Sequence, residues 1–117
     1  MKVIVAGSRT INDRAEIAKA IASSGLKIKE LVSGNARGVD SVAENWAAMN
    51  NIPFKTFPAD WNKYGKPAGA IRNAEMANYA DALIAIWDGK SSGTNNMIKA
   101  MNKLGKPVFL YLVENAR

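Results

Sequence analysis

Short apolar runs alternate with longer amphipathic segments along this chain. The apolar runs predict strands over residues 2–7, 30–33, 53–57, 82–87 and 107–113. The runs VIVA at 3–6 and ALIAIW at 82–87 contain no polar residue, which is typical of strands buried on both faces of a sheet. We expect 82–87 to be a central strand, with neighbours on both sides, and the less apolar 53–57 to lie nearer to an edge.

The segments between these runs have apolar residues at spacings of three and four. They predict helices over residues 13–25, 39–50 and 93–104. Residues 68–80 have a weak apolar stripe and are predicted helical from their composition, and residues 58–67 are predicted as a loop. In the last helix the residues expected to face inward are Met97, Ile98, Met101 and Leu104. The second helix has two candidate starts, Val39 and a capping-box pattern that begins at Ser41.

This order of elements predicts a single α/β domain over residues 1–117. We expect a Rossmann-like, three-layer architecture, with a five-stranded, mainly parallel sheet, helices on both faces and right-handed crossovers. The carboxyl ends of parallel strands share one edge of a sheet, and such folds bind their ligands there. The loops after the first four strands are therefore the candidate site.

These four loops are rich in residues that suit an anionic ligand. Glycines let the backbone approach a ligand closely, free amides at a helix start attract phosphate, and Arg pairs with phosphate. A Trp in a polar loop is suited to stacking on a base. The candidate ligand-binding residues are Gly7, Ser8, Arg9, Ser33, Gly34, Asn35, Arg37, Gly38, Asp40, Asp60, Trp61, Arg72, Asn73, Asp88, Gly89, Ser91, Ser92, Gly93 and Thr94.

Each loop taken alone also fits an ordinary turn, with Arg72 in solvent and Trp61 packed over the end of the sheet. The loop DGKSSGT at 88–94 is the strongest phosphate-binding candidate, because it follows the most apolar strand and opens a helix. It is the convergence of the loops on one edge that favours a bound ligand over four unrelated turns.

The chain of 117 residues carries 16 Lys and Arg against 10 Asp and Glu, a net charge of +6. An anionic partner is therefore expected. The basic residues of the four loops are interleaved with Asp40, Asp60 and Asp88. This mixture suits a compact ligand with phosphates and hydroxyls better than it suits duplex nucleic acid.

Cysteine and histidine do not occur in the sequence. Disulfides, thiolate chemistry, Ser-His-Asp catalysis and imidazole metal sites are therefore excluded, and we expect no metal site and no cofactor. No apolar run reaches the roughly 18 residues of a membrane span, and the first residues do not resemble a secretory signal. A cytoplasmic location is expected.

Five segments together resemble the SLOG superfamily, which joins the DprA/SMF proteins and the LOG ("Lonely Guy") enzymes. They are GSR at 7–9, SGNARGVD at 33–40, PADW at 58–61, AGAIRN at 68–73 and DGKSSGT at 88–94. The sequence is most similar to the small YspA-like branch of bacteria and phages. The resemblance implies a nucleotide-type ligand: a nucleoside phosphate, ADP-ribose or an NAD-derived molecule. The ligand contacts that it implies are Ser8, Arg9, residues 34–38, Asp40, Arg72, Asn73, Ser92, Gly93 and Thr94.

The sequence departs from LOG enzymes at the residues of catalysis. Those enzymes carry a Gly-Gly-x-Gly-Thr-x-x-Glu pattern in which the Glu acts in N-glycosidic cleavage. Alignment on Gly93 and Thr94 puts Met97 at the Glu position, and a thioether cannot handle a proton. An Arg-Lys pair of those enzymes is Arg72-Asn73 here. We therefore expect a binding protein that acts as a sensor, carrier or sequestering protein, not an enzyme.

Two alternatives stay open. An N-glycosidase or phosphoribohydrolase would take its carboxylate from Asp40, Asp60, Asp88 or Glu75. A binder of single-stranded nucleic acid, in the manner of DprA, would use the positive charge and exposed aromatic residues. We also expect a homo-oligomer, because a small sheet leaves helix faces to cover. We expect no membrane partner.

Overall fold

The computed structural model describes residues 1–113. Over this range the elements in chain order are β1 (Lys2–Gly7), α1 (Arg14–Ser23), β2 (Glu30–Ser33), α2 (Val39–Met49), β3 (Phe54–Thr56), α3 (Trp61–Tyr64), α4 (Ala68–Tyr79), β4 (Ala82–Trp87), α5 (Ser92–Lys103) and β5 (Val108–Leu112). Every predicted strand and helix is present, with ends that differ by two residues at most. None of the helices in the described range has the length and hydropathy needed to cross a bilayer.

The strands form one parallel sheet in the order β3-β2-β1-β4-β5. This order confirms the predicted Rossmann-like α/β fold, with β3 at an edge. The chain builds outward from β1 to β3 and then crosses back to β4 on the other side of β1. The direction of winding therefore reverses between β1 and β4, and a crevice forms at their carboxyl ends in folds of this kind.

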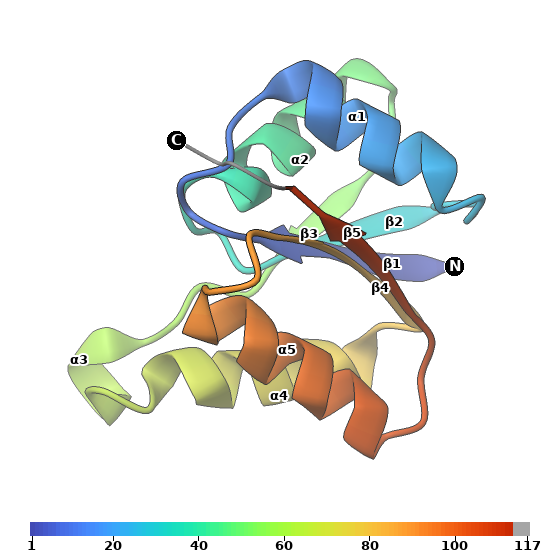
Figure 1. Cartoon of the computed structure of the whole chain (residues 1–117). Coiled ribbons are helices and arrows are strands. Elements are labelled where there is room, and N and C mark those ends of the chain that lie inside the picture. The colour runs from blue at the N-terminus through green and yellow to red at the C-terminus, as the bar shows by residue number, and fades with distance from the viewer. Residues whose placement is uncertain (114–117) are drawn as a thin grey trace.

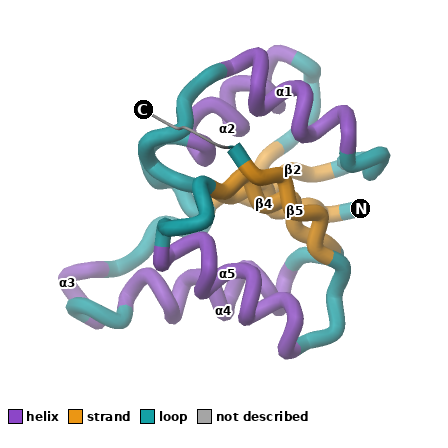
Figure 2. The backbone as a smooth tube through the Cα atoms, in the orientation of Figure 1, coloured by secondary structure: helices purple, strands orange, loops and turns teal. Residues whose placement is uncertain are grey.

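Helices α1 and α2 cover one face of the sheet, and α4 and α5 cover the other (Figures 1 and 2). Side chains along β1 alternate between the two cores, as the pleat of a strand requires. Val3 and Val5 belong to the core under α1 and α2, whereas Ile4 and Ala6 belong to the core under α4 and α5. The apolar runs are thus buried on both faces, as predicted for central parallel strands.

Three local features correct or complete the sequence prediction. The predicted loop 58–67 contains the short helix α3, because Asp60 caps it by accepting a hydrogen bond from the Lys63 amide at 3.1 Å. Leu104 was expected to face inward but is 45% exposed, because α5 ends at Lys103 and the chain then turns at Gly105. Helix α2 begins at Val39, not at the alternative capping box.

Candidate functional site

Two adjoining cavities open at the carboxyl edge of the sheet. The one at the N-terminal end of α5, of about 580 Å³, is the α5 cavity, and the one against the start of α2, of about 480 Å³, is the α2 cavity. Arg9, Ala36, Trp61 and Arg72 line both cavities and form the boundary between them. The loops after β1, β2, β3 and β4 all contribute to the lining, so they meet at one place.

The structure brings most of the predicted site residues together around these cavities. Those that line the α5 cavity are Gly7, Arg9, Asp40, Trp61, Arg72, Asn73, Ser91, Ser92, Gly93 and Thr94. Those that line the α2 cavity are Arg9, Gly34, Asn35, Arg37, Trp61 and Arg72. The other predicted residues line neither cavity. Ser33 ends β2, and the rest lie in the loops around the cavities: Ser8, Gly38, Asp60, Asp88 and Gly89.

Ser8 and Asp88 join the ends of the two central strands. Ser8 is fully buried, and its Oγ accepts a hydrogen bond from the Asp88 amide at 3.1 Å. Asp88 Oδ1 accepts hydrogen bonds from the amides of Lys90 and Ser91, both at 2.8 Å, and these bonds lower the pKa of Asp88. Asp88 therefore shapes the turn that leads into α5.

The N-terminal end of α5 presents free amides beside the α5 cavity. The side chain of its N-cap residue, Ser91, caps no backbone amide of the helix, and its Oγ accepts a hydrogen bond from the Thr94 hydroxyl at 3.4 Å. The carbonyl of Ser91 accepts from the Asn95 amide at 3.2 Å, so the amides of Ser92, Gly93 and Thr94 precede the helical hydrogen-bond ladder. Together with the helix dipole, these amides form an environment that favours an anion.

Gly34 and Gly93 have different surroundings. A Cβ on Gly34 would lie 2.6 Å from Arg72 Nη1 and 3.0 Å from Asp40 Oδ2, so Gly34 allows these side chains to approach the backbone. Gly93 lies in the first turn of α5, and a Cβ there would meet no atom within 4 Å. Packing therefore explains Gly34 but does not explain Gly93.

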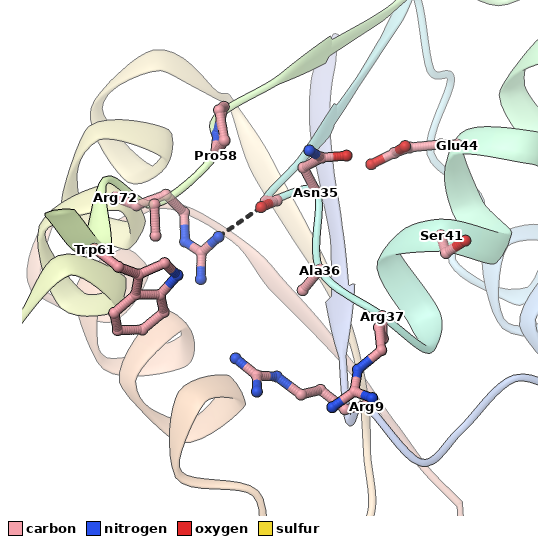
Figure 3. Close-up of a pocket in the computed structure, with 11 residues that line it drawn as sticks. Arg9, Asn35, Ala36, Arg37, Ser41, Glu44, Pro58, Trp61 and Arg72 are labelled. Atoms are coloured by element: carbon pink, nitrogen blue, oxygen red, sulfur yellow. Dashed lines mark hydrogen bonds between the residues drawn. The ribbon is translucent and has the colours of Figure 1, made fainter. Parts of the chain in front are cut away.

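Arg72 connects the boundary of the cavities to α5. Its Nη1 donates to the Gly34 carbonyl at 2.6 Å (Figure 3), and its Nε donates to Asn73 Oδ1 at 2.9 Å. Asn73 is buried and donates in turn to the Gly93 carbonyl and to Asn96 Oδ1. Burial lowers the pKa of Arg72. Because these acceptors are neutral oxygens, the guanidinium remains a source of positive charge for an anion.

Asp40 is 6% exposed and lies near this guanidinium. Its Oδ2 accepts a hydrogen bond from the Ala36 amide at 3.2 Å. Burial raises the pKa of Asp40 to about 6, although the Ala36 bond and the charge of Arg72 act in the opposite direction. A carboxyl group of this kind in a cavity wall can hold or release a proton near neutral pH.

Trp61 is half-exposed, at 51%, and lines both cavities, so it is not packed over the end of the sheet as part of the core. Several lining residues were not selected from the sequence, among them Ser41, Glu44, Asn96 and Met97. Glu44 follows Asp40 by four residues on α2, so the predicted helix already placed the two on one face. Met97 is buried in the wall of the α5 cavity.

Comparison with known proteins agrees with this architecture. Residues 1–64 match the family described as YAcAr: YspA, cpYpsA-related SLOG family. The chain is 37% identical over 119 residues to the Gene 61 protein of Mycobacterium phage D29, a match that covers 92% of this chain and 93% of the phage protein.

A similar fold occurs in the X-ray structure of DNA processing protein A (DprA) from Streptococcus pneumoniae. The TM-score is 0.76 at 20% sequence identity, over 93% of this chain. The match covers 49% of DprA, so this chain spans about half of that protein. The family match, the phage relative and the parallel sheet all lead to one conclusion: this chain belongs to the YspA and cpYpsA-related SLOG family.

Proposed function

We propose that this protein binds a nucleotide or a nucleotide-derived small molecule at the carboxyl edge of its sheet, as a sensor, carrier or sequestering protein. A phosphate of the ligand accepts hydrogen bonds from the first amides of α5. Arg9 and Arg72, at the boundary of the two cavities, provide positive charge. The exposed indole of Trp61 provides a surface on which a base stacks.

The observation that carries this proposal is the open N-terminal end of α5. Glycine within a helix costs up to about 1 kcal/mol relative to alanine. Because a Cβ on Gly93 would meet no atom within 4 Å, packing does not require a glycine there. A glycine does leave space directly beside the free amides, in the wall of the α5 cavity. A phosphate is the group that such an arrangement accommodates.

Thermal-shift and calorimetric titrations test the proposal. The probes are nucleoside mono- and diphosphates of each base, ADP-ribose and a single-stranded oligonucleotide. A saturating ligand raises the unfolding temperature, since it stabilises the folded state by RT ln(1 + [L]/Kd). We expect Gly93→Ala to leave the protein folded and to weaken nucleotide binding at least tenfold, because the added methyl group occupies the phosphate position.

Asn102→Ala is the matched control. Asn102 is exposed at the far end of α5, so this change also introduces alanine into the helix but stays away from both cavities. We expect the control to bind like the wild type. The proposal fails if no nucleotide binds, or if Gly93→Ala and Asn102→Ala bind nucleotide equally well. Tighter binding of the oligonucleotide than of any mononucleotide would favour a nucleic-acid ligand instead.

Asp40 favours a second candidate function, hydrolysis of the N-glycosidic bond of the ligand. It is a buried carboxyl group in the wall of the α5 cavity, and its pKa of about 6 suits proton transfer. Chromatography of a nucleotide incubated with excess protein would detect the free base. If cleavage occurs, Asp40→Asn should abolish it and retain binding. Unchanged nucleotide after incubation with the wild type would reject this candidate.

A further inference from the structure

The α2 cavity extends from the phosphate-binding region toward helix α2, and groups of both charges line it. Arg9 and Arg72 lie where it joins the α5 cavity. In Figure 3, Trp61 and Arg72 lie on one side of the space, and Ser41 and Glu44 lie on the opposite side, on α2. Arg37 also lines this cavity, so the α2 cavity combines the positive charge of Arg9, Arg37 and Arg72 with a carboxylate and a hydroxyl group on α2.

A hydrogen bond from the end of β2 holds the side chain of Glu44 in position. Its Oε2 accepts a hydrogen bond from Ser33 Oγ at 2.6 Å, and Ser33 Oγ in turn accepts one from the Asn35 amide at 3.1 Å. Ser33 is fully buried, so this anchor cannot be displaced easily by solvent. A carboxylate has about four acceptor sites, and the anchor uses one of them. No other residue within 1–113 donates to Glu44, so the remaining acceptor sites are available to a group inside the cavity.

The position of Glu44 restricts what the α2 cavity accepts. A second anion next to the carboxylate is disfavoured by repulsion, whereas hydroxyl donors form strong, charge-assisted hydrogen bonds with it. Carboxylates bind the ribose hydroxyls of dinucleotides in other Rossmann-like folds. From α5 to α2, the chain thus provides the anion site at α5, the three guanidinium groups of Arg9, Arg37 and Arg72, and an acceptor for hydroxyls at Glu44.

We propose that Glu44 is a specificity-determining residue, and that the ligand is a nucleoside diphosphate carrying a second sugar, whose hydroxyl groups donate to Glu44 in the α2 cavity. This inference rests on the proposed function, because it assigns the second half of a ligand whose phosphate lies at α5. The diphosphate spans the junction between Arg9 and Arg72. The Ser41 hydroxyl, on the same wall as Glu44, supplies a further hydrogen bond.

The test compares each nucleoside diphosphate with its sugar-bearing form: ADP with ADP-ribose, UDP with UDP-glucose, and GDP with GDP-mannose. Calorimetry gives the gain in affinity from the sugar for the wild type and for Glu44→Gln. For the pair that binds, we expect a gain of about tenfold or more in the wild type, the size typical of hydrogen bonds to a charged group. In Glu44→Gln we expect the gain to fall to within about twofold, with the affinity for the plain diphosphate unchanged.

Glu75→Gln is the matched control, because Glu75 is exposed on α4 and lines neither cavity. It should retain the full gain from the sugar. If Glu44→Gln proves unstable, Glu44→Asp keeps the charge but shortens the side chain, and it should also lose the gain.

The outcomes separate this inference from the proposed function. Binding of neither form of any pair would overturn both. Binding of a diphosphate without a gain from its sugar, or a gain that survives in both Glu44 variants, would overturn the inference alone. An equal loss of the plain diphosphate and its sugar-bearing form in Glu44→Gln would show that Glu44 contacts the nucleoside half, which also overturns the inference.

Discussion

The buried carboxyl group of Asp40 makes the stability of this protein depend on pH in an unusual direction. Its pKa is about 6 in the folded protein and 3.8 in an ordinary solvated state. One pKa unit corresponds to about 1.4 kcal/mol, so ionised Asp40 disfavours the folded state by about 3 kcal/mol. Because the pKa of Asp40 is raised in the folded protein, its contribution to the unfolding free energy is fully present below pH 3.8 and is lost as the pH rises through 6.

Replacing Asp40 with Asn removes the titration and keeps an oxygen that accepts from the Ala36 amide. Between pH 4 and pH 7.5 the wild type should therefore lose about 2 kcal/mol of unfolding free energy relative to Asp40→Asn, because part of the full contribution of about 3 kcal/mol is already lost at pH 4. This is a large fraction of the stability of a typical domain, which is about 5–15 kcal/mol. The variant should be the more stable protein above pH 7.

Urea unfolding of both proteins at several values of pH measures this difference directly. Other carboxyl groups titrate in both proteins, so their contribution cancels in the comparison. Glu75→Gln, at an exposed site, serves as the control and should follow the wild type at every pH. Parallel stability profiles for the wild type and Asp40→Asn would refute the reasoning, since they would mean that the pKa of Asp40 is the same in the folded and unfolded states.

Two further predictions concern the loops and helix ends that build the site. Gly34→Ala should lower the unfolding free energy by about 1–3 kcal/mol, because its Cβ would lie 2.6 Å from Arg72 Nη1 and displace the hydrogen bond to the Gly34 carbonyl; an unchanged urea midpoint would contradict this. Lys106→Met should cost about 1–2 kcal/mol, because Lys106 Nζ donates to three carbonyls at the C-terminal end of α4, at 2.7–3.1 Å. Lys99→Met, at an exposed position on α5, should change stability by less than about 0.5 kcal/mol, and equal losses in the two Lys variants would refute the role of Lys106.

Much of the fold follows from local patterns. The runs 3–6 and 82–87 contain no polar residue, which is typical of strands with both faces covered, and the amphipathic segments between them are typical of helices with one buried face. The short helix α3 escaped prediction because four residues are too few to show a period, and its start depends on a single side-chain bond from Asp60. Leu104 was misassigned because periodicity does not show where a helix leaves its sheet.

The candidate site was likewise predicted in part from the sequence, and the rest of it depends on the tertiary structure. Glycines and Arg residues at strand ends were visible in the sequence, since the edge at which parallel strands end is set by topology. Only the tertiary structure shows which of these residues line a cavity and which make room for other parts of the chain. Gly34 makes room for the side chain of Arg72, which lies 38 positions away in the sequence, whereas a Cβ on Gly93 would face open space. The tertiary structure also placed Glu44 in a cavity wall through its bond to Ser33. The sequence alone determined the alternation of elements, because burial imposes a period on neighbouring residues; the roles of individual polar residues depend on contacts between distant segments, and only the folded chain brings those segments together.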